Sequence, residues 1–326
     1  MVVLHLGLTV LAMSAAAQSA VAPAPLYRDP VHDGATDPAL IYDAGKHQWL
    51  MFYTSRRADV APEEKGDVRW IHGTKIGVAE SPDGVNWKYR ADADIPAACT
   101  GATLWAPELG RYGGLYHMWL TVVPGVFKDW NASRSIVHLT SRDLVKWDCH
   151  ETLNLGSDRV IDASVVEVQP NQYRIWFKDE RDGSRIKFYD SNDLEHWTPG
   201  GTAIQSKGEG AKVFRWRDRW WMISDAWKGL LVSHSPDTKT WTQQDEYLLA
   251  QPGTRPTDRA MGHHADVVVS GDRAFLYYFV HQGDEPDAKN DPLARQRSVV
   301  QVTELHEADG KITVDRNSTT EFSLRP

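Results

Sequence analysis

The 326-residue sequence lacks several features that would place it in a large functional class. It contains no Lys- or Arg-rich block, and its formal net charge of −8 argues against a nucleic-acid-binding surface. Its two cysteines, Cys99 and Cys149, are too few for a disulfide framework, although they can form one bond in an oxidising compartment. The sequence alone leaves that pairing open.

Long hydrophobic runs are also scarce. The run VLHLGLTVLAM at residues 3–13 is shorter than the ~20 residues of a membrane span, and no later run approaches that length. Small residues, SAAAQSA, follow it, which is the layout of a secretory signal peptide cleaved after Ala17, or as late as residue 25. An ordinary apolar N-terminus is the alternative. We expect a secreted or periplasmic protein without a membrane span.

Tryptophan, in contrast, is abundant, with 14 residues in the chain. A buried indole needs a partner for its N–H group, and its flat ring suits stacking on a sugar face. The excess favours a carbohydrate ligand, and it is also compatible with core packing.

A pattern Ser-x-Asp-x-x-x-Trp occurs four times, starting at Ser81, Ser141, Ser191 and Ser235. The Ser and Asp side chains can bond the backbone of a tight turn, and the Trp can pack back over it. The copies are separated by 60, 50 and 44 residues, which suits propeller blades of ~40–50 residues with insertions.

A second repeat, a short apolar strand, a polar turn and an aromatic strand, occurs five times. The five copies are DPALIYDAGKHQWLMFYT from Asp37, WAPELGRYGGLYHMWLT from Trp105, DASVVEVQPNQYRIWFK from Asp162, EGAKVFRWRDRWWMIS from Glu209 and HADVVVSGDRAFLYYFV from His264. Alternating hydrophobic residues with Gly, Asn or Asp turns indicate β-hairpins, and no segment shows a sustained helical period. We predict an all-β fold, a five-bladed β-propeller, with residues 26–326 as a single domain.

The first strand of each propeller blade runs beside the central axis, so residues at the same register should meet at one mouth of the channel. Those residues are Asp37, Trp105, Asp162, Glu209 and His264. Each acid taken alone is more simply a turn or strand-terminal residue. Three acids at equivalent positions, where strands normally avoid Asp and Glu, instead indicate a functional site retained against charge repulsion.

Three of these segments, GATDPALIY, VIDASVV and GEGAKVF, resemble in order and spacing the acidic motifs of glycoside hydrolase family 43. The resemblance covers about residues 28–305 and implies a five-bladed propeller glycosidase. It implies that Asp37 is the general base, Glu209 the general acid, and Asp162 the residue that tunes and orients the acid. The chain departs from the pattern at Ala163, where Pro is frequent, and at Ala211-Lys212, where Pro-His is frequent, so the substrate subgroup is not fixed.

Glycoside cleavage needs one protonated and one ionised carboxyl group, and ~6.5–9.5 Å between them leaves room for the water of an inverting reaction. We expect Glu209, in an apolar blade near Asp162, to stay protonated and Asp37 to stay ionised. The expected substrates are oligo- or polysaccharides carrying arabinofuranoside, xyloside or galactoside units. The resemblance implies no cofactor for the chemistry, and a structural Ca²⁺ near the axis with His264 as a ligand, through water, is one hypothesis.

Segments after the second strand of each hairpin should rim the same mouth. They supply the predicted substrate-binding residues Arg56, Arg181 and Trp227, in addition to Trp105; the alternative for each Arg is an exposed loop charge. Insertions at residues 56–73 and 122–135 can close one end of the groove, which favours exo action. Two other functions stay open: a carbohydrate-binding propeller without activity, and a retaining fructosidase-like hydrolase.

Overall fold

The computed structural model describes residues 19–326, so the predicted signal peptide at residues 1–17 lies outside the described residues. The described chain is almost entirely β-structure, with three 3₁₀-helices of one turn each: η1 (Arg69–Ile71), η2 (Ala97–Cys99) and η3 (Ala288–Asn290). Within residues 19–326, no helix has the length and apolarity needed to cross a membrane. The predicted all-β class is confirmed.

The strands form five consecutive four-stranded antiparallel sheets, which are the blades of a propeller. Blade 1 contains β2 (Ala35–Asp43), β3 (Gln48–Ser55), β4 (Lys75–Ser81) and β5 (Lys88–Asp92). Blade 2 contains β6 (Thr103–Tyr112), β7 (Leu115–Val123), β8 (Ser135–Ser141) and β9 (Asp148–Thr152). Blade 3 contains β10 (Val160–Gln169), β11 (Gln172–Asp179), β12 (Arg185–Ser191) and β13 (Thr198–Ile204). Blade 4 contains β14 (Glu209–Trp216), β15 (Arg219–Asp225), β16 (Leu230–Ser235) and β17 (Thr242–Gln243). Blade 5 contains β18 (Gly262–Ser270), β19 (Arg273–His281), β20 (Ser298–Ala308) and β21 (Lys311–Val314).

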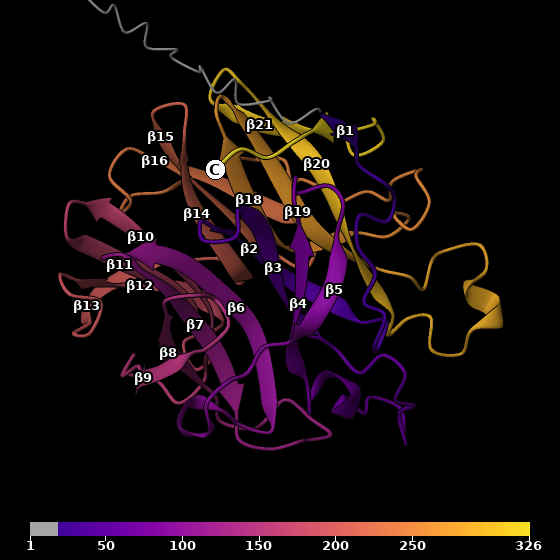
Figure 1. Ribbon diagram of the computed structural model, residues 1–326, viewed down its shortest axis with the longest axis horizontal. Coiled ribbons are helices and arrows are strands. Elements are labelled where there is room, and N and C mark those ends of the chain that lie inside the picture. Colours follow the sequence, from indigo (N-terminus) through magenta and orange to yellow (C-terminus); the bar gives the residue numbers. More distant parts are fainter. Residues whose placement is uncertain (1–18) are drawn as a thin grey trace, which may run out of the picture.

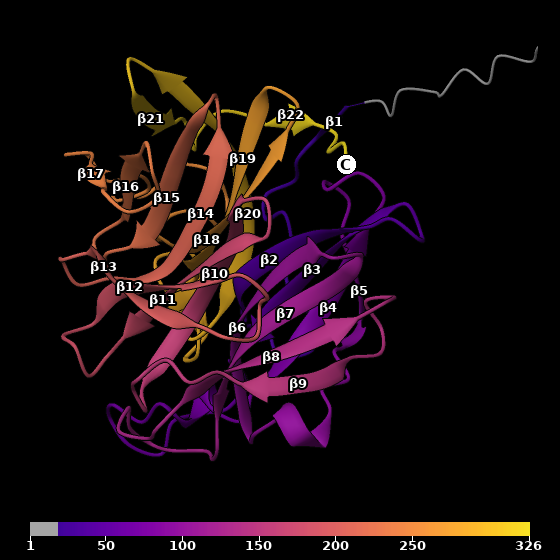
Figure 2. The same ribbon diagram turned by 90° about the vertical axis from the view of Figure 1, so that its left-hand side faces the viewer.

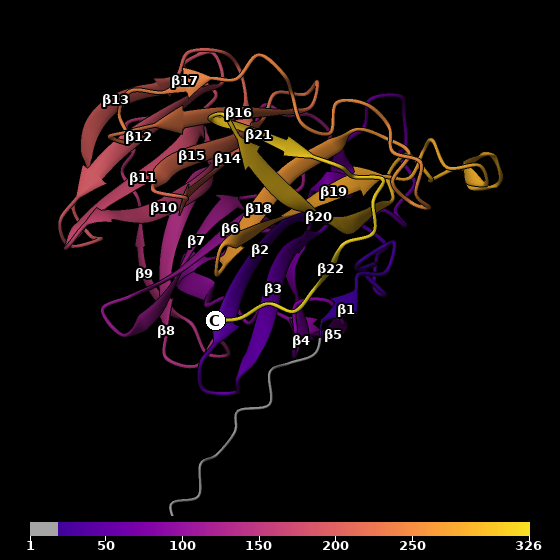
Figure 3. The ribbon, with the colours of Figure 1, turned by 90° about the horizontal axis from the view of Figure 1, so that it is seen from above.

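The blades close into a ring through their innermost strands. Each first strand contacts the next, in the order β2, β6, β10, β14, β18 and back to β2. Figures 1 and 3 show the colours passing once around the molecule, so that β18 of the last blade lies beside β2 of the first. The two ends of the described chain also meet, because β1 (Ala20–Val21) pairs with β22 (Glu321–Phe322), as Figure 2 shows. The prediction of five blades is confirmed.

The second strand of each blade is buried on both faces because the two neighbouring blades pack against it, as Met51 of β3 packs on blade 5 and Phe52 on blade 2. Its aromatic residues form much of the core, and Trp119, Trp176 and Trp221 are fully buried. Part of the tryptophan excess therefore serves packing. Trp130 and Trp227, in contrast, remain 47% and 44% exposed.

The Ser-x-Asp repeat forms the hairpin between the third and fourth strands of blades 1 to 4. In the first copy, Ser81 Oγ donates to Asp83 Oδ1 and accepts from the Gly84 amide at 2.9 Å, while Asp83 Oδ1 accepts from the Asn86 amide at 2.8 Å. The same bonds recur around Asp143, Asp193 and Asp237. The predicted side-chain-to-backbone turn is confirmed.

A β-bulge interrupts each first strand at the same height. There two residues of the first strand lie opposite a single residue of the second strand. The bulges open at the pairs Asp37-Pro38, Ala106-Pro107, Asp162-Ala163, Gly210-Ala211 and His264-Ala265. The prediction of one shared register is therefore wrong for Trp105 and Glu209, which lie one residue before the bulge. They still face the axis, because a bulge breaks the strict alternation of side chains that the prediction assumed.

The bulges are held by the preceding blade. The Ala106 amide donates to Thr54 Oγ1 at 2.8 Å, the Asp162 amide to Thr121 Oγ1 at 3.2 Å, and the Gly210 amide to Asp162 Oδ2 at 3.1 Å. Asp37 and Asp162 adopt φ angles of 51° and 60°, a region that non-glycine residues enter at a cost of ~1–3 kcal/mol, most often at functional sites. Each acid is thus fixed by its neighbouring blade rather than by its own sequence alone.

Candidate active site

A cavity of about 330 Å³ opens at one end of the propeller axis. All five inner strands contribute to it, together with loops from blades 1, 2 and 4. Its lining residues are Asp37, Arg56, Ile71, Trp105, Trp130, Arg134, Ile161, Asp162, Lys178, Glu180, Glu209, Trp227 and His264. The cavity therefore gathers all three predicted catalytic acids, which come from blades 1, 3 and 4.

Asp37 is buried among groups that favour its ionised form. Arg56 Nη2 lies 3.7 Å from Asp37 Oδ1, His264 Nδ1 lies 3.4 Å from the same oxygen, and Thr36 Oγ1 donates to Oδ2 at 3.1 Å. Burial alone would raise the pKa of Asp37, but Arg56, His264 and the threonine hydroxyls outweigh it and lower the pKa. The expectation of an ionised Asp37 agrees with this environment.

Asp162 carries the opposite perturbation. Burial raises the pKa of Asp162 to about 7; His264 and Lys178 oppose the rise, and the carboxylate of Glu209 adds to it. The surroundings of Asp162 thus favour its protonated form far more than water does.

Glu209 stands in an ion-pair network. Lys178 Nζ lies 2.8 Å from Glu209 Oε2 and 3.2 Å from Glu180 Oε1, and Glu180 also pairs with Arg134. Lys178 therefore holds Glu209 in a close ion pair, a contact that the sequence prediction did not include. The expected protonation of Glu209 stays a prediction.

His264 faces the acids, and Gly210 makes room for it. A Cβ atom at residue 210 would lie 2.7 Å from His264 Cγ, and the φ angle of Gly210 is +56°. Burial lowers the pKa of His264, but Asp37, Asp162 and Glu209 outweigh it and raise the pKa. His264 Nδ1 thus faces Asp37, and the surrounding acids favour the protonated imidazole.

The next register position along the inner strands bears on the Ca²⁺ hypothesis. There Lys212 Nζ lies 2.9 Å from Glu108 Oε2 and 2.9 Å from Asp266 Oδ1. Ca²⁺ requires six to eight oxygen ligands, and here the buried carboxylates already neutralise an ammonium group. The residues present do not fit a calcium ion at this position, because Glu108 and Asp266 are both paired with Lys212.

Tryptophan and the two insertions build the wall of the cavity. Trp105 Nε1 donates to the Ile71 carbonyl at 2.7 Å, and its ring lies 6.1 Å from that of Trp130. The insertions also meet each other, since Lys128 Nζ lies 3.0 Å from Glu64 Oε1. The exposed Trp227 ring stands across from this wall, with Lys178 Nζ 5.0 Å from its centre.

The structure corrects one rim residue and adds four. Arg181 does not line the cavity, because it leaves the end of β11 on an exposed loop and pairs with Asp158 at 2.8 Å. Lys178 lines it instead, being paired in register with Ile161, the neighbour of Asp162. Sequence reasoning also missed Glu180, Arg134 and Trp130. The available signal for Lys178 and Glu180 was the charged segment KDER at residues 178–181, which directly follows the aromatic strand.

Solved structures with the same architecture were found. A thermostable family-43 glycoside hydrolase matches with a TM-score of 0.64 and 18% identity, over 92% of this chain and 98% of that chain. An exo-β-1,3-galactanase from Phanerochaete chrysosporium matches with a TM-score of 0.66 and 13% identity, over 91% of this chain and 67% of that chain. The fold is that of family-43 glycoside hydrolases. An α-L-arabinanase from Cellvibrio cellulosa, solved with arabinohexaose, shares it with a TM-score of 0.60 and 14% identity, over 86% of this chain and 95% of that chain.

No protein-family model and no curated protein sequence matches the chain. The likeness therefore lies in the fold.

Proposed function

We propose that this protein is a glycoside hydrolase that cleaves arabinofuranoside, xyloside or galactoside units from oligo- or polysaccharides with inversion of configuration. The observation that carries the proposal is the meeting of Asp37, Asp162 and Glu209, from three blades, in one cavity. Two of these carboxyl groups have pKa values moved in opposite directions. Such separation is what acid and base roles in one site require.

In this mechanism Asp37 acts as the base that activates water, because its surroundings keep it ionised. Glu209, 27% exposed at its side chain, is accessible to the glycosidic oxygen and donates the proton. Burial and the nearby carboxylate of Glu209 raise the pKa of Asp162 to about 7. Asp162 thus lies close enough to orient and tune Glu209, which donates its proton to the bound glycosidic oxygen.

Exo action is supported by the shape of the cavity. Its volume of about 330 Å³ lies near the lower end of ligand sites, ~300–1,000 Å³, and the insertions close one side. Trp130 and Trp227 offer exposed faces for stacking on the terminal sugar, and Arg56 is placed to bond its hydroxyl groups. The chemistry requires no cofactor.

We also infer that the protein is exported, to the cell exterior or the periplasm. The signal-like N-terminal sequence supports this, and so does the disulfide between Cys99 and Cys149, whose Cα atoms lie 5.4 Å apart. Disulfides persist in oxidising compartments.

The decisive experiment follows product anomers by ¹H NMR during hydrolysis of aryl α-L-arabinofuranoside, β-D-xyloside and β-D-galactoside. We expect turnover of at least one substrate, with a first-formed sugar of inverted configuration. A retained configuration would support the fructosidase-like alternative. Binding of the matching oligosaccharides with no turnover by the wild type would support the non-catalytic propeller.

The pH dependence of kcat/KM tests the role of Asp162. We expect a bell-shaped profile with an alkaline limb near pH 7, where Asp162, whose pKa burial raises to about 7, loses its proton and places a further negative charge beside Glu209. The acid limb should lie below the ordinary Asp range of about 4, because Asp37 must be ionised and its pKa is lowered. The amide of Asp162→Asn has no such proton to lose, so the limb near pH 7 should be absent in that variant. An unchanged limb would rule out Asp162 as its origin.

A further inference from the structure

A second cluster of ionisable side chains lies on the outer half of blade 2, away from the cavity. It contains His138 on β8 and His150 and Glu151 on β9, and one ligand atom of each lies within 4.8 Å of one from each of the others. His138 is 1% exposed, whereas His150 lies at the surface. None of the three lines the cavity or takes part in the proposed reaction.

Hydrogen bonds fix which nitrogen of His138 bears its proton. His117 Nε2 lies 3.2 Å from the Tyr112 carbonyl, which can only accept, so His117 Nε2 carries the hydrogen. A neutral ring that donates through Nε2 accepts through Nδ1, so His117 Nδ1 is an acceptor. His138 Nε2 lies 2.8 Å from that Nδ1 and must donate to it.

Because His138 Nε2 bears the hydrogen of the neutral ring, His138 Nδ1 carries a lone pair and cannot donate. His138 Nδ1 is buried without a hydrogen-bond partner, and so is Glu151 Oε1. Two buried acceptors in one cluster are costly unless a cation or a proton joins them.

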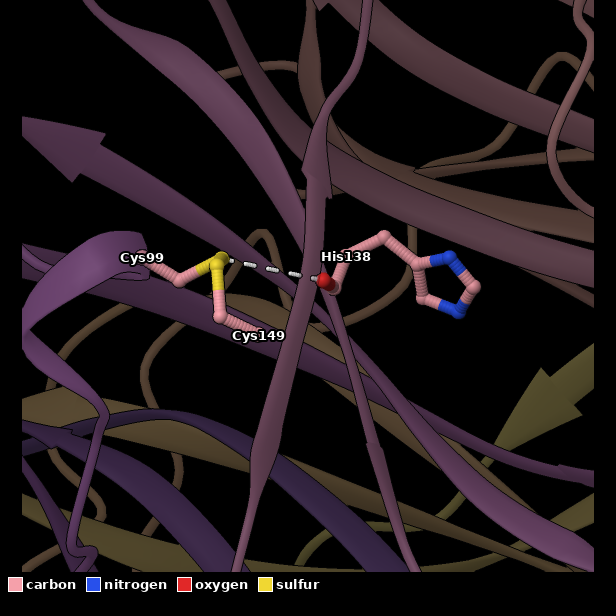
Figure 4. Close-up of a disulfide and its surroundings, with 3 residues drawn as sticks. All are labelled: Cys99, His138 and Cys149. Atoms are coloured by element: carbon pink, nitrogen blue, oxygen red, sulfur yellow. Dashed lines mark hydrogen bonds between the residues drawn. A yellow bond between two sulfur atoms is a disulfide. The ribbon is translucent and has the colours of Figure 1, made fainter.

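The pairing of β8 with β9 places His150, the remaining ligand, beside His138 and Glu151. His138 pairs with Glu151 and Leu139 with Cys149, so His150 lies in a β-bulge between them. The disulfide anchors this bulge from the other side of β8. Figure 4 shows the His138 ring on the opposite side of its strand from the Cys99–Cys149 bond, whose Cys99 sulfur lies 3.8 Å from the His138 carbonyl oxygen.

We propose that His138, His150 and Glu151 form a binding site for a divalent transition-metal ion of the zinc type. Two imidazoles and a carboxylate are ligands that Zn²⁺ prefers, and water would complete the tetrahedron on the exposed side. The hydrogen bond from His138 to His117 is the outer contact that orients a metal-ligating imidazole. His150 Nε2 has a similar partner, Glu195 Oε1 of blade 3, at 3.5 Å, which leaves its Nδ1 for the ion. The ion would tie the outermost strand of the blade to β8 beside the disulfide.

The test titrates chelator-treated, full-length protein with ZnCl₂ by calorimetry and counts bound metal by elemental analysis. We expect one Zn²⁺ per chain and a rise in Tm on binding. His150→Ala and Glu151→Gln, both at partly exposed positions that the fold does not need, should weaken binding by at least ~10-fold. Glycosidase activity should not change in either variant.

His196→Ala is the matched control, because Asp193, Glu195 and His196 form an exposed cluster nearby that could hold zinc adventitiously. We expect this variant to bind as the wild type does. Loss of binding in His196→Ala with retention in His150→Ala would overturn the proposal. Absence of saturable zinc binding in the wild type would also overturn the proposal. It would mean that a proton on Glu151, and not a metal ion, joins Glu151 to His138 Nδ1.

Discussion

Asp37→Asn and Glu209→Gln are each expected to lower kcat by about 10²–10⁴-fold, the usual contribution of a general acid or base. Both substitutions keep the shape of the side chain, so binding of a non-hydrolysed oligosaccharide, measured by calorimetry, should change far less. Asp218→Asn is the control, because Asp218 lies in the β14–β15 turn of the same blade as Glu209 and is fully exposed.

The leaving group separates the two roles. The phenolate of an aryl glycoside with an acidic phenol leaves without being protonated. On such a substrate Glu209→Gln should therefore recover much of its rate, and Asp37→Asn should not. Equal rate losses on good and poor leaving groups in Glu209→Gln would show that Glu209 is not the acid. Wild-type rates in both variants would remove the acid–base assignment while leaving the fold untouched.

The site was predictable from sequence where it depends on repetition. Asp37 and Asp162 open equivalent hairpins, and the periodic turns around Asp83 and its three counterparts set the blade spacing, so convergence on one axis follows from the repeat alone. The misplaced register of Trp105 and Glu209 has a physical cause. A bulge adds a residue to the strand without changing its hydrophobic pattern, so no count of apolar positions detects it.

The cations were harder to predict because their effect depends on distance. Lys178 and Arg181 both follow the aromatic strand YRIWF in one charged segment. Only the register of β10 with β11 brings Lys178 to Glu209 and leaves Arg181 facing Asp158. The electrostatic environment of the acids follows from those contacts, so the sequence identified the three carboxyl groups but not Lys178, the cation that pairs with Glu209.

Lys212 offers the largest expected effect on stability. Lys212→Met keeps most of the side-chain volume but leaves Glu108 and Asp266 facing each other without a cation, with side chains only 7% and 3% exposed. Removing one partner from a buried ion pair typically costs about 3–5 kcal/mol, so we expect a loss of that size in the free energy of unfolding measured in urea.

Two further measurements identify repulsion as the cause. Burial already raises the pKa of Glu108 in the wild type, and loss of Lys212 removes the main group that lowers it. A carboxyl group with a raised pKa in the folded state destabilises the protein above that pKa, so the deficit of Lys212→Met should shrink as the pH falls from 8 to 5. The triple variant Glu108→Gln, Lys212→Met, Asp266→Asn should recover part of the lost stability, because no buried charge remains unpaired. A loss of stability that is independent of pH and persists in the triple variant would mean that Lys212 stabilises the protein by packing. It would not then act as the cation that pairs with Glu108 and Asp266.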